Sequence, residues 1–209
     1  MRVVNPFAVS GAAMTPVARR ATILALLAAL MAATRVHHFG AVPDASWAVF
    51  FIGGVYLATW TRWAFPALMT LAVAVDAFVI TSQGLSFWTH YCVSPAYWCL
   101  VPAYFAMWAG GVWLKRHLDG PALTGALKLV ASLVASVAVC HLVAQGSVDW
   151  ISSSVAEPSL AGWWKNYTDW LLPYMRAAAL YVGAAAMLHV LLTRVLPKPA
   201  AGARPLRAD

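Results

Sequence analysis

Long apolar runs, separated by short polar connections, limit the folds open to this chain of 209 residues. A helix needs about 20 apolar residues to cross the roughly 30 Å hydrocarbon core of a bilayer, and six runs come close to that length. Lipid offers the backbone no hydrogen-bond partners, and the runs are too continuously apolar for barrel strands. The sequence therefore predicts an all-α integral membrane protein, a bundle of six transmembrane helices. We place them at 18–36, 46–60, 64–81, 96–114, 122–144 and 170–195.

The composition agrees with this class and predicts the lipid bilayer as a partner. Hydrophobic residues make up 62% of the chain and charged residues only 10%, which is outside the range of soluble domains. We expect one transmembrane domain over residues 1–196 and a disordered cytoplasmic tail over 197–209, rich in Pro, Ala and Arg. The sequence contains no P-loop motif, so no motif for ATP hydrolysis is present.

Lys and Arg indicate the orientation, because these residues are enriched in cytoplasmic loops. With both termini in the cytoplasm, ten fall inside and only Arg35 and Lys165 fall outside. The inner ten are Arg2, Arg19, Arg20, Arg62, Lys115, Arg116, Arg194, Lys198, Arg204 and Arg207. The net charge of +7 thus reflects topology, and we predict no nucleic-acid partner.

The first apolar run is open to a second interpretation. Arg19 and Arg20 followed by an apolar run from Ala21 to Ala33 also fit a cleaved signal peptide. We favour a retained first helix, because the apolar run continues toward Val36.

The longest connection, about 145–169, is rich in Ser and contains Pro158 and Gly162. It is followed by the aromatic residues Trp163, Trp164, Tyr167 and Trp170. We expect an outer loop that ends in an interfacial aromatic belt, serving either as a lid over an outward-facing pocket or as a plain connector.

Two charged residues fall inside predicted spans. Asp76 lies about five residues from the outer end of the third helix, and Arg176 about six from the outer end of the sixth. At 1.5 Å per residue, both are roughly 8 to 9 Å below the outer surface, where they could pair. Such charges usually face a bundle interior or a cavity, so the pair is either a functional site or a structural ion pair.

Cys92 is a lone thiol in an uncharged loop between two apolar spans. It precedes Pro95, which suits the first turn of a helix, and a thiolate is favoured near a helix N-terminus. Thiolates select soft metal centres. Four histidines are expected on the same outer side: His37, His38, His90 and His141. The alternative is an incidental loop cysteine among interfacial histidines.

Three segments carry a family resemblance. The runs Arg35-Val36-His37-His38-Phe39-Gly40, Pro43–Phe51 and Cys92-Val93-Ser94-Pro95-Ala96-Tyr97, the last together with Pro102-Ala103-Tyr104, resemble the BtuM-type cobalamin transporters. These are small six-helix proteins of the bacterial inner membrane, akin to the substrate-binding S-components of energy-coupling-factor (ECF) transporters. The resemblance covers about the first 115 residues, and its specific part is Cys-x-x-Pro-Ala-Tyr at 92–97.

The resemblance implies a role for each matching residue. Cys92 would supply an axial sulfur ligand to the cobalt of cobalamin or cobinamide, and cyanocobalamin can lose its cyanide in the process. Tyr97 and one of His37 and His38 would line the pocket, and Tyr91 is a candidate aromatic wall. Arg176 is the candidate for the basic residue of the family's pocket, without a motif to support it. Whether decyanation makes the protein an enzyme stays open.

The resemblance also implies a partner, an ECF coupling module that docks on small residues of the first helix. Ala21, Ala25, Ala29 and Ala33 recur every fourth residue and permit close helix approach. We favour ordinary internal packing for this stripe, because Ala is common throughout the chain. Solitary members of the family are thought to work without the module.

Two functions of other classes fit the same residues. One is a membrane redox protein that holds haem or copper through His37, His38, His90 and His141. The other is a subunit of a larger membrane complex, in which Cys92 and the histidines have no role.

Overall fold

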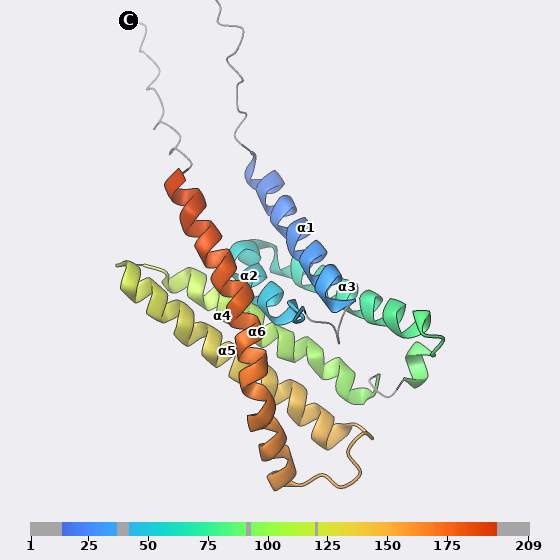
Figure 1. Cartoon of the computed structure of the whole chain (residues 1–209). Coiled ribbons are helices and arrows are strands. Elements are labelled where there is room, and N and C mark those ends of the chain that lie inside the picture. Colours follow the sequence, from blue (N-terminus) through green and yellow to red (C-terminus); the bar gives the residue numbers. More distant parts are fainter. Residues whose placement is uncertain (1–13, 37–41, 91–92, 120, 196–209) are drawn as a thin grey trace, which may run out of the picture.

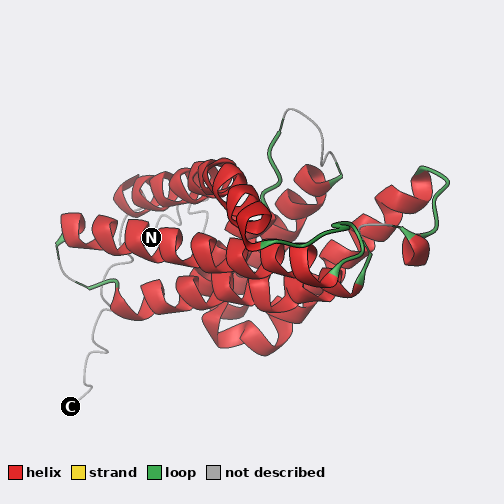
Figure 2. Ribbon diagram, turned by 90° about the horizontal axis from the view of Figure 1, so that it is seen from below, coloured by secondary structure: helices red, strands yellow, loops and turns green. Residues whose placement is uncertain are grey.

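The computed structural model describes residues 14–36, 42–90, 93–119 and 121–195, and every regular element within these ranges is helical (Figures 1 and 2). The α-helices are α1 (Pro16–Arg35), α2 (Ser46–Leu57), α3 (Thr61–Ser82), α4 (Leu100–His117), α5 (Ala122–Ile151) and α6 (Leu160–Val195). Short 3₁₀ helices are η1 (Ala58–Trp60), η2 (Phe87–Thr89) and η3 (Pro95–Cys99).

Four helical stretches are long and apolar enough to cross a membrane: Pro16–Arg35, Ser46–Ser82, Ala122–Ile151 and Leu160–Arg194. The chain is thus a multi-pass membrane protein, as the sequence predicted. The second stretch contains α2, η1 and α3. Helix α4 has only 18 residues and ends in the basic turn Lys115–His117. The count of six spans therefore stays a prediction.

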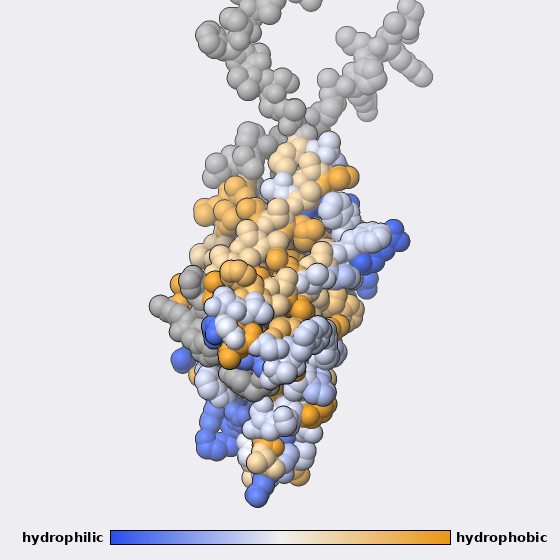
Figure 3. All heavy atoms as spheres, turned by 90° about the vertical axis from the view of Figure 1, so that its right-hand side faces the viewer, coloured by the Kyte–Doolittle hydropathy of each residue, from blue (hydrophilic) through white to orange (hydrophobic). Residues whose placement is uncertain are grey.

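The surface agrees with a lipid environment. Figure 3 shows apolar atoms gathered across the middle of the face that it presents, with hydrophilic atoms toward the edges. Helix α1 begins, and α6 ends, at the same end of the bundle (Figure 1). Both of these ends carry basic residues, with Arg19 and Arg20 near the start of α1 and Arg194 in the last turn of α6.

Helix α2 is the centre of the bundle, because it is apolar on all sides. Every residue from Ser46 to Gly54 is buried, and α1, α3, α4 and α6 all pack on this helix. Its crossing with α4 is unusually close. A Cβ on Gly54 would lie 2.1 Å from the carbonyl oxygen of Trp108, and one on Gly111 would lie 2.0 Å from that of Phe51. Only glycine allows these two backbones to meet.

The predicted loop over 145–169 is wrong. Helix α5 continues to Ile151 and α6 begins at Leu160, so only residues 152–159 connect them. The aromatic residues of the expected loop end, Trp163, Trp164, Tyr167 and Trp170, belong to the first turns of α6. Lys165 and Asp169 reinforce these turns through an i,i+4 ion pair, with Nζ 2.5 Å from Oδ2. The two helices, of 30 and 36 residues, measure about 45 and 54 Å, which exceeds the hydrocarbon core.

Candidate functional site

Arg35, the last residue of α1, is the hub of a buried polar network. Its side chain is only 5% exposed. The guanidinium Nε and Nη2 donate to the two oxygens of Asp76 on α3, at 2.6 and 2.7 Å, which is a bidentate ion pair. Nη1 lies 3.2 Å from Asp44 Oδ2, 3.0 Å from Ser46 Oγ and 3.1 Å from the Tyr104 hydroxyl. One side chain thus joins α1, the start of α2, α3 and α4.

Tyr97 extends this network to η3. Its hydroxyl donates to Asp76 Oδ2 at 2.6 Å, so that Oδ2 accepts from both Tyr97 and Arg35. Tyr97 N in turn donates to Ser94 O at 2.9 Å, and Val93 N donates to His90 O at 2.8 Å. The described part of the Cys92–Tyr97 segment is therefore tied to α3 through its tyrosine. Asp44 accepts from Ser46 N and Ser46 Oγ as well, at 2.9 and 2.6 Å.

The expected pair of Asp76 and Arg176 does not form, because Asp76 is occupied by Arg35. Arg176 is exposed on α6. Helix α6 begins ten residues before the predicted start, so Arg176 lies about 15 Å farther from the start of its helix than the sequence predicted. The distribution of Lys and Arg predicted that Arg35 lies in an outer loop. The sequence does contain a hint of its role, because Asp44 and Asp76 are two acids near apolar segments and a buried acid needs a cationic partner.

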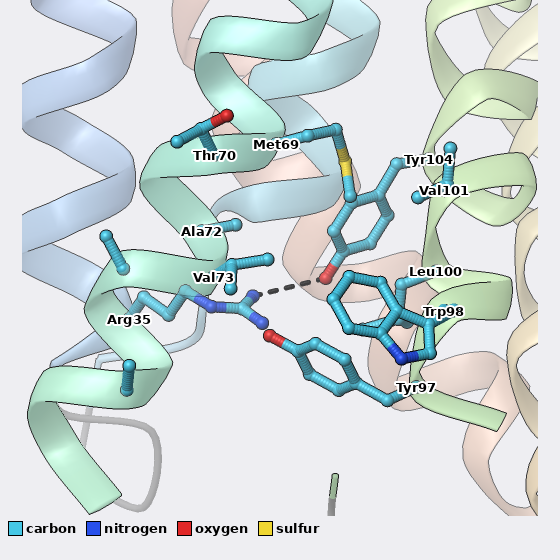
Figure 4. A pocket seen from close by; sticks show the side chains of 12 residues that line it. Arg35, Met69, Thr70, Ala72, Val73, Tyr97, Trp98, Leu100, Val101 and Tyr104 are labelled. Atoms are coloured by element: carbon cyan, nitrogen blue, oxygen red, sulfur yellow. Dashed lines mark hydrogen bonds between the residues drawn. The ribbon is translucent and has the colours of Figure 1, made fainter. Parts of the chain in front are cut away.

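A cavity of about 400 Å³ opens beside this network, between α3 and the η3–α4 segment (Figure 4). Arg35, Tyr97 and Tyr104 form its polar side, and their polar atoms point toward one another in the figure. The other lining residues are apolar or small: Met69, Thr70, Ala72, Val73, Ala74, Ala77, Trp98, Leu100 and Val101. An apolar cavity with a few convergent polar groups is the usual form of a small-molecule site.

His141 occupies a different buried place, on α5. It is 1% exposed, and its Nε2 lies 3.0 Å from the carbonyl oxygen of Tyr167. A carbonyl can only accept, so Nε2 carries a hydrogen and is not free to bind a metal. The ring packs among Trp47, Tyr167 and Tyr174, and the Trp47 and Tyr174 rings stack at 4.5 Å. His141 thus contributes to the packing of α5, α6 and α2.

Four predicted site residues, His37, His38, Tyr91 and Cys92, lie outside the described residues, and Tyr97 is the predicted residue that joins the Arg35 network. Of the histidines invoked for a redox protein, the described part of the chain contains His90 and His141. His90 is half-buried after η2. No cluster of three or more His, Cys, Asp or Glu side chains able to hold a metal occurs in the described ranges.

The alanine stripe of α1 is exposed. Ala21, Ala25, Ala29 and Ala33 all lie on the surface, whereas Leu27, Met31 and Thr34 form the buried face of the helix. The expectation that the stripe serves internal packing is therefore wrong.

No protein-family model matches this chain, and a comparison with curated proteins finds no match.

Proposed function

We propose that this chain takes up cobalamin or cobinamide across the bacterial inner membrane, and that the Cys92 thiolate binds the corrinoid cobalt from the outer face. The main support for this proposal is the segment Cys-x-x-Pro-Ala-Tyr at 92–97. Its tyrosine, Tyr97, joins a buried polar network and lines a cavity. The proposal includes six membrane spans, with α2, α3 and α4 each crossing separately and both termini in the cytoplasm.

The chemistry of the cavity supports a corrinoid as the substrate. A corrin is a large amphipathic ring with amide side chains, so its site needs aromatic and apolar walls with hydrogen-bonding groups at the rim. Trp98 and Val101 supply apolar walls, and Tyr97 and Tyr104 supply hydroxyls. A whole corrinoid is larger than about 400 Å³, so this cavity would receive one part of it and leave the ring at the outer surface.

The thiolate would exchange ligands with cyanocobalamin without outside electrons. A cobalt–sulfur bond forms, the cobalt–carbon bond to cyanide breaks, and cyanide leaves with its electron pair. The cobalt keeps its oxidation state in this step. A reductive decyanation would need an electron donor supplied by another protein or by a small thiol, so uptake is the primary activity that we propose.

The visible spectrum of the detergent-purified protein tests the proposal. Wild type, Cys92→Ala and the matched control Cys99→Ala are mixed with cyanocobalamin and freed of unbound ligand. Cobalt–sulfur ligation predicts a retained corrinoid with shifted bands in wild type and Cys99→Ala, and no such shift in Cys92→Ala. A protein that retains no corrinoid in any of the three forms would refute the proposal. A haem-like band would instead favour a redox protein.

The exposed alanines of α1 support an ECF coupling module as partner, since small residues on a lipid-facing surface allow a second helix to approach closely. We propose Ala25 and Ala29 as the centre of this contact. Replacement of both by Leu should reduce uptake in cells that contain the module and leave corrinoid binding by the purified protein unchanged. Unchanged uptake in those cells would show that transport is solitary.

A further inference from the structure

A second groove lies at the opposite end of α4 from the site described above. It has a volume of about 350 Å³ and runs between the η1–α3 junction and α4. Ala58 and Thr61 line one side, and Phe105, Trp108 and Val112 line the other.

Between its basic end and Phe105, the walls of this groove are mainly apolar. The indole nitrogen of Trp108 donates to Thr61 Oγ1 at 2.9 Å, and that hydroxyl donates to Ala58 O at 2.7 Å. The polar groups of the wall are thus satisfied within the protein. Phe105 and Trp113 are 48% and 44% exposed, so the groove opens on the surface that faces lipid. Its occupant should carry a long apolar part.

The length of the groove matches one leaflet of a bilayer. From Phe105 to Arg116 the α4 axis advances about 16 Å, at 1.5 Å per residue. Half of a roughly 30 Å hydrocarbon core is about 15 Å. An acyl chain lying along the groove would therefore begin at the membrane surface near Arg116 and end near the bilayer midplane at Phe105.

The surface end of the groove is cationic. Arg116 and His117 line it, and Lys115 precedes them in the last turn of α4. Within the described residues, neither Lys115 nor Arg116 has a salt-bridge partner. Lys128 adds a charge, since its Nζ donates to the carbonyls of His117 and Asp119 at 2.6 and 3.2 Å. Asp119 is the one acid between Lys115 and Lys128, so three permanent cations and one carboxylate give this region a net positive charge.

We propose that this groove binds an anionic phospholipid, with one acyl chain against Phe105, Trp108 and Val112 and the phosphate at Arg116. The positive end selects a headgroup with net negative charge over a zwitterionic one. The assignment to the cytoplasmic leaflet rests on the orientation proposed above, whereas the site itself depends neither on corrinoid binding nor on Cys92.

Native mass spectrometry of the full chain in a neutral detergent provides the test. The protein is incubated with phosphatidylglycerol or with phosphatidylcholine of the same acyl chains, and the retained lipid is counted. We expect preferential retention of phosphatidylglycerol. Arg116→Gln should weaken the binding of phosphatidylglycerol about fivefold, because each cation near a headgroup contributes about 1 kcal/mol. Arg194→Gln, at the end of α6, removes an equal charge away from the groove and should have no effect.

A second variant tests the acyl chain independently of charge. Ala109 is exposed and lines the groove, so Ala109→Trp should fill it and lower retention of phosphatidylglycerol. The matched control is Ala179→Trp, at an exposed position of α6 away from the groove. Melting temperatures verify that all variants fold. Three outcomes would each overturn the proposal. They are equal retention of the two lipids, an equal loss of phosphatidylglycerol binding in Arg116→Gln and Arg194→Gln, and undiminished phosphatidylglycerol binding by Ala109→Trp. Displacement by glycerol phosphate alone would also overturn it, because it would identify a site for a soluble phosphate.

Discussion

Loss of Arg35 should destabilise the protein more than any other single change in the polar network. Arg35→Met removes the cation from two carboxylates at once, those of Asp76 and Asp44. Among the described residues, Asp76 then keeps only the Tyr97 hydroxyl, and its side chain is 19% exposed, so little water can compensate. Breaking a buried pair by removing one partner costs about 3–5 kcal/mol, and we expect Arg35→Met to fall in this range.

Asp76→Leu should cost less, because Arg35 retains Asp44 at 3.2 Å and the hydroxyls of Ser46 and Tyr104. The double variant, Arg35→Met with Asp76→Leu, removes both charges from the α1–α3 contact. Replacing a buried pair by apolar side chains is often nearly neutral. The double variant should therefore be more stable than Arg35→Met alone, with a coupling of about 2–3 kcal/mol between the two sites.

Unfolding by SDS in mixed micelles, followed by tryptophan fluorescence, measures these free energies. The exposed pair of Lys165 and Asp169 is the control, because an i,i+4 surface pair should couple by no more than about 0.5 kcal/mol. A coupling of this small size between Arg35 and Asp76 would refute the view that the network holds the bundle. If the double variant regains stability but binds no corrinoid, the pair belongs to the site and is more than a structural clamp.

Three further changes test the fold and the network by the same unfolding measurement. Gly54→Ala should destabilise the protein by at least about 2 kcal/mol, since its Cβ would meet the Trp108 backbone at 2.1 Å. The control Gly183→Ala on α6 meets nothing within 4 Å and should be neutral or slightly stabilising. Equal effects of the two substitutions would contradict the close crossing of α2 and α4. Tyr97→Phe deletes the 2.6 Å bond to Asp76 and should cost about 1.5–3 kcal/mol, and a cost near zero would show that the bond does not form. Gly84→Ala should cost about 1 kcal/mol because Gly84 has φ of +75°, and no loss would show that this turn tolerates a side chain.

The sequence predicted where apolar helices lie better than where they end. Hydropathy placed α2 with η1 at 46–60, which the structure confirms, because lipid and core both require continuous apolar surface there. It failed at the end of α5 and at the start of α6. There Ser, Gly and Trp suggested a loop. In the structure both helices extend beyond their apolar regions, and they are joined by contacts such as that of His141 Nε2 with Tyr167 O. Local composition cannot report a contact between residues 26 positions apart.

Arg35 was difficult to identify for a related reason. Counting charges near helix ends assumes that such residues reach water, and Arg35 instead turns inward to Asp76, 41 positions away in the sequence. Only the three-dimensional arrangement connects it to Tyr97, the residue at the end of the Cys-x-x-Pro-Ala-Tyr segment. Because Asp76 Oδ2 accepts from both side chains, we expect a change that moves Arg35 to move Tyr97 as well. The proposed binding segment is thus tied to α1 and α3 in addition to α4, and a variant of Arg35 should disturb corrinoid binding through Tyr97 as well as through the cavity that Arg35 lines.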